Sequence, residues 1–568
     1  MKEKWYLLIS FFKSNRLLTT VAFICGFIYN IFTLLIPISI GRFYEFNFGF
    51  SSHRLKLIES FPFLNTDSFI RFLFFFIALV IIRFVFEYIN KYLISIAGER
   101  FVKNLREQLF EHQLQINTTI YDQKGIGKYL LRYSGDMKSI QDYITKGMFQ
   151  FSQDMLLIIF LIAAIALIDL NSGLVVAASI AFTIVALFFI NKALNTISVN
   201  RRNQRSGLLS FVNTRLRAIS SIKVLNKYSI EQKRYVDRSE KLYQTGKKYQ
   251  VVANLIYSFI PAITYLMIAL VMWYVYYLKT NSGDTFNQPS FLILILLIIS
   301  FMPILRRTFR VSIIWKLGNI SFAKLLAIFT LDAENRLPLQ RINFSGQSIK
   351  LNDVSFKYST SDNLIFNKAN ILFSPKNLTL VFGDSGSGKN TLINLLLKIH
   401  KPTTGNITYG ENDQKALSEK TIRRNISIVS DDFPLYGKTV YEAIVYSRNK
   451  EVELKAGILL NELQQFEDDR NRLKLHDLIG DLGKSLTSGQ KRILMYCRAF
   501  LSNKPWLILD TPFKDQNPDT VKHLANLLNS LSGKKGIIVF DSKIPEALAA
   551  NRIYAIKNNA LVEVKSSV

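Results

Sequence analysis

The sequence predicts a bundle of six membrane-spanning helices followed by an α/β domain with a phosphate-binding loop. Three observations support this fold class. Long apolar runs with little or no charge occupy the first 330 of the 568 residues. Farther along the chain, short strand-like runs alternate with helical stretches. One of these strands leads into a glycine-rich loop that ends in a lysine. We therefore expect two domains, at 1–330 and 331–568.

The composition excludes several other classes of protein. Hydrophobic residues make up 49% of the chain and charged residues 20%, so it is too apolar to be disordered and less charged than an ordinary soluble enzyme. Its two cysteines, Cys25 and Cys497, lie far apart and form neither a disulfide framework nor a metal-binding spacing. The net charge of +29 suits either a nucleic-acid-binding protein or a membrane protein with basic inner loops.

Six apolar runs are long enough to cross a bilayer, which requires about 20 residues in a helix. The run 17–41 contains no charged side chain at all. The second run is interrupted by Arg83 and Glu87, which are four residues apart and can pair with each other on a helix. Buried helices of a large soluble protein are the alternative, but six such runs in succession argue against it. We expect spans at about 17–41, 68–97, 148–169, 172–193, 250–278 and 287–312.

The distribution of Lys and Arg predicts the orientation of these spans. The segment 98–150 holds eight such residues and the segment 192–250 holds fourteen, whereas the turn 169–173 holds none. Basic residues concentrate in cytoplasmic loops. We therefore expect a multi-pass protein of the plasma (inner) membrane, with the N-terminus and the second domain in the cytoplasm. This topology accounts for the positive charge without a nucleic-acid partner.

The two long basic segments are expected to be helical, because their apolar residues recur at helical spacing and Gly and Pro are few. The spans would then continue into the cytoplasm as long helices, with turns near 118–128 and 212–222. Residues 1–14 are predicted to form an amphipathic helix at the membrane surface, with Trp5 and Tyr6 at the level of the lipid headgroups.

The most specific local motif is the loop GDSGSGKNT at residues 383–391, which follows the strand 378–382 and precedes an apolar helix. In such a loop the glycines let backbone N–H groups surround phosphates, and the helix N-terminus adds a positive dipole. The side chain of Lys389 would reach the β and γ phosphates. The motif calls for Ser or Thr as a magnesium ligand after the lysine, but Asn390 stands there. By itself the loop could also be an ordinary glycine-rich turn.

Four further segments accompany this loop in a characteristic order. The sequence LTSGQ at 486–490 opens a helix, and WLILD at 506–510 is an apolar strand that ends in a carboxylate, as a Walker B strand does. Upstream, Tyr358 could stack on adenine, and the segment 426–440 could join two lobes of a domain. Together with the six spans, this order resembles an ATP-binding cassette (ABC) half-transporter of the exporter type.

The resemblance covers nearly the whole chain and implies that ATP and Mg are bound. In that family each ATP lies between the phosphate loop of one cassette and the signature of another. The resemblance therefore assigns the signature residues Thr487, Ser488, Gly489 and Gln490 to the ATP of a partner. Asn390 and Asp510 would be weak magnesium positions. The residues that would contact the chain's own nucleotide are Tyr358, Gly383, Ser385, Gly386, Gly388, Lys389, Asn390, Thr391 and Asp510.

The chain departs from the family at the catalytic positions. A Glu normally follows the Walker B Asp and polarises the attacking water, but here the residue is Thr511, which cannot act as a carboxylate base. Asp431 replaces the Gln of the lobe-joining loop, and Ser542 replaces the switch His. Asn517 stands for an Asp that crosses the dimer. With Asn390, these changes predict a cassette that binds nucleotide but hydrolyses it weakly or not at all.

The resemblance and its departures together predict half of an ATP-driven exporter that moves an unidentified cargo across the plasma membrane by alternating access. A second, catalytically intact ABC half-transporter is the favoured partner, and a homodimer is left open. Arg306, Arg307 and Arg310, at the end of the sixth span, favour an anionic or amphipathic cargo if they face a cavity instead of the membrane surface. The alternative function is a nucleotide-binding, non-hydrolysing membrane homodimer that acts as a regulator or a channel.

Overall fold

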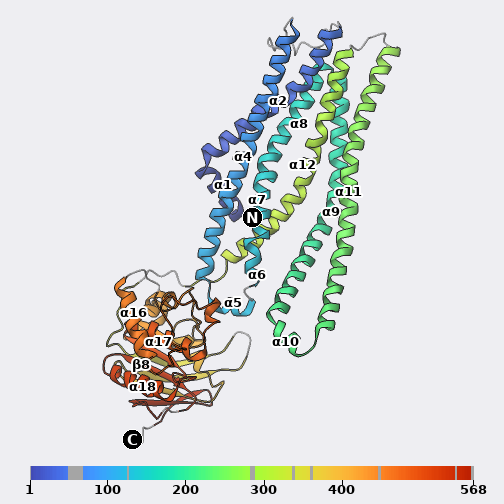
Figure 1. Ribbon diagram of the computed structural model, residues 1–568. Coiled ribbons are helices and arrows are strands. Elements are labelled where there is room, and N and C mark those ends of the chain that lie inside the picture. Colours follow the sequence, from blue (N-terminus) through green and yellow to red (C-terminus); the bar gives the residue numbers. More distant parts are fainter. Residues whose placement is uncertain are drawn as a thin grey trace. The chain divides into compact units, whose positions relative to one another are not determined.

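The computed structural model describes residues 2–48, 68–124, 127–281, 288–334, 340–358, 362–445, 450–543 and 546–564. Contacts divide the chain into two compact units (Figure 1). The helical unit comprises residues 1–114 and 124–331, and the cassette unit comprises 115–123 and 332–568. The short stretch 115–123 thus belongs with the second unit, although it lies far from it in the sequence. A backbone bridge between Ile116 and Ala333 ties it there.

The helical unit contains six helical segments that are long and apolar enough to cross a membrane, which confirms the number of predicted spans. Two of these segments, α9 and α11, have 48 and 54 residues and lie side by side as a long hairpin (Figure 1). At 1.5 Å per residue each exceeds about 70 Å, more than twice the thickness of a bilayer core. The six segments are α2 (Arg16–Phe48), α4 (Phe69–Gln115), α7 with α8 (Gly135–Ile144, Phe151–Ile168), α9 (Leu170–Arg217), α11 (Tyr228–Asn281) and α12 (Gln288–Phe329).

Short helical segments complete this part of the chain. They are α1 (Lys2–Ser14), α5 (Thr118–Lys124), α6 (Gly127–Leu130), η2 (Leu131–Tyr133), the π-helical η3 (Thr145–Gln150) and α10 (Ile219–Val224). The first inner turn lies where it was predicted. The second inner turn was predicted about five residues too early, at 212–222: α9 continues to Arg217 and the chain reverses at 218–227. The helix continues past 212 because neither Gly nor Pro occurs between 212 and 217 to end it.

The N-terminal helix α1 is anchored by a buried lysine. Lys4 Nζ donates to the hydroxyl of Tyr143 at 3.1 Å and to Asn319 Oδ1 at 2.9 Å. Trp5 and Tyr6, in contrast, are exposed, as expected of residues that face lipid headgroups. In the second span Arg83 and Glu87 form the predicted ion pair, at 3.5 Å.

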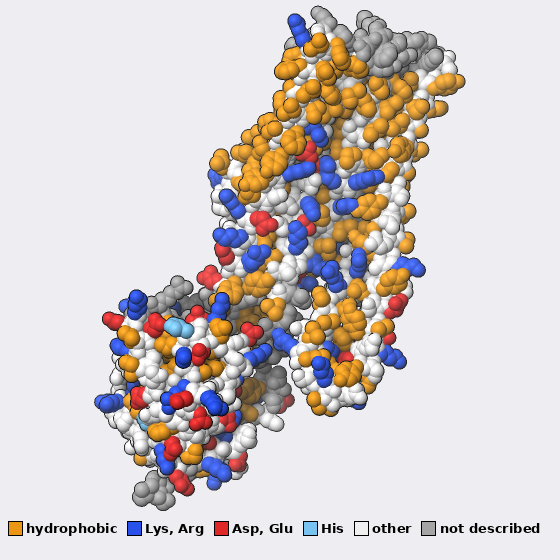
Figure 2. Space-filling view, in the orientation of Figure 1, with side chains coloured by type: hydrophobic (Ala, Val, Ile, Leu, Met, Phe, Trp, Pro, Cys, Tyr) orange, Lys and Arg blue, Asp and Glu red, His pale blue; other side chains and the backbone are white. Residues whose placement is uncertain are grey.

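The surface of the helical unit is divided by side-chain type. Figure 2 shows that hydrophobic side chains cover the end of this unit away from α10, and that Lys and Arg are more frequent nearer to α10. Large apolar side chains on α4, α9 and α11 are exposed there, among them Phe74, Phe188 and Trp273. Such a wide apolar surface is unfavourable in water and suits a bilayer.

The cassette unit is built on two sheets. The larger has the strand order β10-β9-β3-β8-β7-β6, in which β9, β3, β8, β7 and β6 are parallel, and the smaller, antiparallel sheet has the order β2-β1-β4-β5. The strands are β1 (Ile349–Phe356), β2 (Phe366–Phe373), β3 (Leu378–Phe382), β4 (Thr404–Tyr409), β5 (Asn412–Asp413), β6 (Ile426–Val429), β7 (Trp506–Asp510), β8 (Gly536–Asp541), β9 (Arg552–Lys557) and β10 (Ala560–Val564).

Helices surround the parallel strands, which explains why those strands are almost continuously apolar. All five residues of β7 are buried. The helices are α13 (Lys389–Leu396), η4 (Gln414–Ala416), α14 (Glu419–Asn425), α15 (Val440–Ile444), α16 (Lys450–Leu463), η5 (Asp481–Gly483), α17 (Ser488–Leu501) and α18 (Pro518–Ser532). Because β3, β8, β7 and β6 run in parallel, the segments that follow them leave the sheet at one edge, where α/β proteins bind ligands.

Candidate functional site

The phosphate loop connects β3 to α13 at this edge. Gly386 and Gly388 have φ angles of +83° and +105°, which favour glycine because a Cβ atom would be strained there. Gly388 directly precedes α13, so the backbone N–H groups of the first turn are open to an anion. Lys389 Nζ donates to the carbonyls of Gly383 at 2.6 Å and Asp384 at 2.9 Å. The ammonium group therefore lies over the loop, where phosphate oxygens can replace these carbonyls.

Tyr358 is linked to the start of this helix. Its hydroxyl lies 2.9 Å from Thr391 Oγ1, and its ring packs edge-on against Phe356 and His400. The ring is only partly buried. The structure thus brings together the phosphate loop and the aromatic residue that the sequence predicted to stack on adenine.

Asn390 and Asp510, the predicted magnesium positions, both have protein partners. Asn390 Nδ2 donates to Asp432 Oδ2 at 2.7 Å, and the buried Ser430 Oγ donates to Asp510 Oδ2 at 2.9 Å. Among the described residues, no cluster of three or more His, Cys, Asp or Glu could hold a metal by itself. A site with one or two carboxyl or amide oxygens nevertheless fits Mg²⁺, which takes its remaining ligands from water and nucleotide phosphates.

Burial raises the pKa of Asp510 above its ordinary value. The hydrogen bond from Ser430 lowers this pKa, and the neighbouring carboxylates of Asp432 and Asp431 raise it. The charge of Arg492 also lowers this pKa, but burial is the largest effect and keeps the pKa raised. The ionised carboxylate is therefore destabilised when no metal ion is bound. A bound divalent ion would remove much of this destabilisation.

Thr511, in the position of the catalytic base, has a strained backbone. Its φ angle is +46°, which is rare for a β-branched residue. Its N–H donates to the carbonyl of Phe540 at 2.7 Å, and its own carbonyl accepts from Arg492 Nη1 at 2.6 Å. Hydrogen bonds at its N–H and at its carbonyl hold Thr511 in this conformation. Its side chain offers a hydroxyl and no carboxylate to an attacking water.

Asp431 and Ser542, two further positions at which the sequence predicted a departure from the family, both have polar partners. The Asp431 carboxylate pairs with Arg492 at 2.9 Å and with Lys514 at 3.4 Å. Both contacts hold the Asp431 carboxylate against cationic side chains of its own cassette. Ser542 is exposed, and its hydroxyl donates to Asp541 Oδ1 at 3.4 Å.

The signature segment begins α17 with a capping box. Thr487 Oγ1 accepts from the Gln490 N–H at 3.2 Å, and Gln490 Oε1 accepts from the Thr487 N–H at 2.9 Å. Thr487 and Ser488 are exposed. A Cβ atom on Gly489 would lie 2.9 Å from the carbonyl oxygen of Asp515, so this glycine lets the two segments pack closely. The signature therefore presents an exposed helix N-terminus.

Asn517 keeps a structural role despite the change from Asp. It is the N-cap of α18, where its Oδ1 accepts from the Thr520 N–H at 2.7 Å. Asn and Asp are about equally good in this position. Its Nδ2 also donates to Glu467 Oε1 at 3.1 Å, a contact that an ionised Asp could not make.

Arg492 is the residue that the sequence analysis missed. It is 1% exposed, and besides its bonds to Thr511 and Asp431 it donates to the carbonyl of Asp510 at 2.9 Å. A signal for it exists in the sequence: it is a cation directly before the apolar run Ile493–Cys497 of a helix, where burial requires partners. Its partners could not be identified without the fold, because they come from β7 and from the segment after β6.

Comparisons with known proteins agree with this architecture. Residues 19–308 match the family model for the ABC transporter transmembrane region, and residues 366–514 match the model for ABC transporters. Proteins named ATP-dependent lipid A-core flippase from Pseudoalteromonas translucida and Nitrosococcus oceani are 23% and 22% identical, over 86% of this chain and 84% and 82% of theirs. A solved structure of a bacterial Atm1-family ABC exporter with ATP bound superposes with a TM-score of 0.80, at 16% identity and over 97% of this chain and 95% of that chain.

Proposed function

The chain belongs to the ABC transporter family, as a half-transporter of the exporter type that carries its six-span membrane domain and its cassette in one polypeptide, and we propose that its own cassette binds ATP but does not hydrolyse it. The observation that supports this proposal is the state of the catalytic positions. Thr511 has no carboxylate, and Asp431 is paired with the buried Arg492. The general base is absent from the position that the family uses, and the nearest acidic replacement is occupied.

Nucleotide binding is supported by the phosphate loop and by Tyr358. The open N-terminus of α13 and the Lys389 ammonium group would neutralise the ATP phosphates, and Tyr358 would pack against the base. Asp510 and Asn390 would hold Mg²⁺, which supplies positive charge to the phosphates. The amide oxygen of Asn390 would replace the hydroxyl oxygen of Ser or Thr as a ligand, so we expect metal binding to be weakened and not abolished.

We propose that the working transporter is a heterodimer with a catalytically intact ABC half-transporter. In this arrangement the exposed signature at Thr487–Gln490 completes the partner's ATP site, and the partner's signature completes the site at Lys389 and Asp510. One site hydrolyses ATP and the other holds it. The cassette and the N-terminus lie in the cytoplasm, as the concentration of Lys and Arg in the inner segments 98–150 and 192–250 indicates.

ATP binding would close the two cassettes, and the long helices α9 and α11 would carry this movement into the membrane and drive alternating access. The relatives named lipid A-core flippases favour an amphipathic cargo that enters from the bilayer. The cationic end of the sixth span, with Arg306, Arg307 and Arg310, favours an anionic one.

The proposal is tested by measuring ATP turnover of the purified full chain without a partner. We expect nucleotide binding with turnover far below about 1 per second, the lower end of the usual enzyme range. Thr511→Glu should restore little turnover, because Asn390, Asp431 and Ser542 remain. Turnover of about 1–10 per second by the chain alone would contradict the proposal.

Co-purification from the native host separates the two assemblies. Recovery of a second cassette chain with an intact catalytic Glu, and turnover only when both chains are present, supports the heterodimer. Recovery of this chain alone as a stable dimer that binds ATP without turnover would instead support the regulatory or channel-like homodimer.

A further inference from the structure

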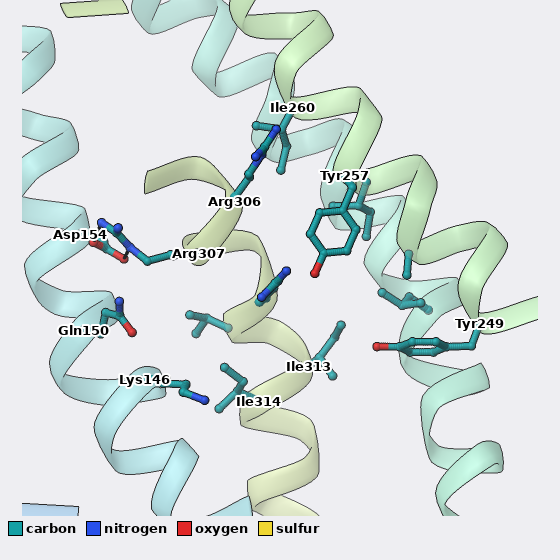
Figure 3. A pocket seen from close by; sticks show the side chains of 15 residues that line it. Lys146, Gln150, Asp154, Tyr249, Tyr257, Ile260, Arg306, Arg307, Ile313 and Ile314 are labelled. Atoms are coloured by element: carbon teal, nitrogen blue, oxygen red, sulfur yellow. Dashed lines mark hydrogen bonds and ion pairs between the residues drawn. The ribbon is translucent and has the colours of Figure 1, made fainter. Parts of the chain in front are cut away.

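The helical unit contains a cavity of about 460 Å³ between η3–α8 and the helices α9, α11 and α12 (Figure 3). Helix α12 contributes its arginine cluster, and α11 contributes two tyrosines. In Figure 3 the labelled side chains of Arg306 and Tyr257 lie on facing elements of the cavity. The cavity is therefore built by segments far apart in the sequence.

The charges that line this cavity are strongly unbalanced. Four cations line it, Lys146, Arg306, Arg307 and Arg310, against one carboxylate, Asp154. That carboxylate is already used: Arg307 donates to Asp154 Oδ1 at 2.7 Å and to Oδ2 at 3.1 Å. Two guanidinium groups, those of Arg306 and Arg310, have no carboxylate within 4.0 Å in the part of the chain that the structure describes.

Arg310 is held at the cavity without being neutralised. Its guanidinium carbon lies 4.7 Å from the centre of the Tyr257 ring. A cation–π contact orients the charge and leaves it free to attract an anion. Lys146 is partly neutralised by Asp142, at 3.0 Å. The two arginines thus provide about two uncompensated positive charges, and guanidinium groups match phosphate oxygens in geometry.

Most of the remaining lining is apolar, and it lies beside the cationic part. The side chains that provide this surface include Ile256, Ile260, Ile313 and Ile314. A small inorganic anion would leave this surface without a partner. A molecule with an anionic headgroup and a hydrocarbon part would contact both kinds of surface.

The backbone around the cavity is irregular on two sides. The wall at Lys146 and Gln150 is a π-helical segment, η3, whose Gly147 carbonyl accepts a hydrogen bond from Trp315 Nε1 at 2.8 Å. On α12, Pro303 lies inside the helix three residues before Arg306. Both features interrupt regular helix hydrogen bonding, and π-helical segments are frequent at functional sites.

We infer that this cavity binds the phosphate headgroup of an anionic amphiphile, with Arg306 and Arg310 as its direct ligands and the isoleucine surface against its hydrocarbon part. The inference rests on the proposed function, because it assigns this site to the transported cargo. Snorkelling of the arginines to the membrane surface is the simpler explanation of their position in the sequence. Their place on the wall of a cavity, with Arg310 against Tyr257, favours binding.

Equilibrium binding tests the inference without nucleotide and without a partner chain. The full chain is placed in nanodiscs of phosphatidylcholine, and binding of labelled didecanoyl phosphatidate is measured. Inorganic phosphate and didecanoylglycerol, which has the same chains but no phosphate, serve as competitors. The variants are Arg306→Gln and Arg310→Gln. Lys316→Gln is the matched control, because Lys316 is an exposed cation on the same helix and does not line the cavity.

We expect saturable binding of phosphatidate that each arginine variant weakens about tenfold, with no change in Lys316→Gln. Diacylglycerol and inorganic phosphate should each compete at least about a hundredfold less well. Equal competition by diacylglycerol would overturn the role of the headgroup, and equal competition by inorganic phosphate would overturn the role of the hydrocarbon part. Unchanged binding in both arginine variants would overturn the site.

Binding of a fluorescent ATP analogue is measured on the same samples. Normal ATP binding in every variant shows that the protein is folded, so a loss of phosphatidate binding then reports on the cavity. Failure of the cargo site with intact ATP binding leaves the proposed cassette function standing. Turnover by the chain alone would contradict the proposed function and would not affect this site.

Discussion

The Asp431 carboxylate lies 2.9 Å from Nη2 of Arg492, a guanidinium that is 1% exposed and also donates to the carbonyls of Asp510 and Thr511. One side chain thus connects the segment after β6, the signature helix α17 and the end of β7. Asp431 is itself half exposed, so the pair lies at the boundary between core and solvent. Where the family resemblance predicts a glutamine, this cassette has an ion pair that attaches the lobe-joining loop to the strand end.

The first prediction concerns the stability that this pair provides. Arg492→Leu should destabilise the cassette by about 3 kcal/mol or more, because two buried carbonyls and Asp431 lose their partner. Asp431→Asn should cost only about 1 kcal/mol, since its side chain is half exposed and solvent screens the charge. Hydrogen exchange of the β7 amides, measured by mass spectrometry in the full chain of each variant, checks both expected losses of stability. Equal effects of the two variants would contradict the central role of Arg492.

The second prediction concerns pH. Because burial raises the pKa of Asp510, the folded state binds its proton more tightly than the unfolded state does. The free energy of unfolding therefore falls as pH rises from the ordinary pKa of Asp through the raised pKa of Asp510. Above the raised pKa the carboxylate is ionised in both states, and the folded protein is less stable than it is at low pH. Asp510→Asn should remove this dependence and raise the thermal unfolding temperature of the nucleotide-free protein near pH 7.

The same variant should weaken the effect of Mg²⁺ on ATP binding, because an amide replaces the carboxylate. Unfolding temperatures between pH 4 and pH 8, with and without MgATP, provide the measurement. A nucleotide-free variant that is less stable than the wild type near pH 7 would show that the carboxylate is stabilised in the fold.

The third prediction separates binding from turnover. Lys389→Ala should weaken ATP binding to this cassette at least about tenfold, because the phosphates lose a charge-assisted contact. In a heterodimer it should leave part of the turnover, since the catalytic phosphate loop belongs to the partner. Lys522→Ala, at an exposed position on α18, is the control. Complete loss of turnover would mean that occupancy of this site is obligatory or that this site is the active one.

The fourth prediction concerns the signature. Gly489→Asp should reduce turnover of the heterodimer about tenfold or more, because a side chain meets the Asp515 carbonyl at 2.9 Å and a negative charge faces the partner's ATP. Lys522→Ala, at the exposed position on α18, is again the control and should leave turnover intact. Steady-state hydrolysis by the complex is the readout. Wild-type turnover in Gly489→Asp would refute the composite site and, with it, the heterodimer.

The fifth prediction concerns the backbone of Thr511. Its φ angle of +46° is unfavourable for a β-branched residue, so Thr511→Asn should stabilise the cassette by about 0.5–1 kcal/mol. Thr511→Val keeps the branched shape and serves as the control for loss of the hydroxyl. Thermal unfolding of both variants checks the effect. Destabilisation by Asn equal to that by Val would show that the Thr511 hydroxyl matters more than the backbone conformation.

Much of the fold follows from patterns that are local in the sequence. The uncharged run 17–41 was recognisable as a spanning helix because a single apolar segment of this length satisfies its own backbone in lipid only as a helix. The strand before Lys389 and the apolar strand that ends at Asp510 were recognisable for a similar reason, since their apolar runs are bounded by loop residues. The end of α9 was misplaced because helix ends depend on weak signals, and here neither Gly nor Pro marks the turn.

The chain's order of residues therefore determined its class, its six spans and the chemistry missing at Thr511, all of which depend on residue type and spacing. The tertiary structure alone decided that Arg492 binds Asp431 and that Arg306 and Arg310 share a cavity with Tyr257. These relationships join segments tens of residues apart. Whether a buried or enclosed charge is neutralised depends on which distant groups the fold brings within hydrogen-bond distance, and no local pattern encodes that.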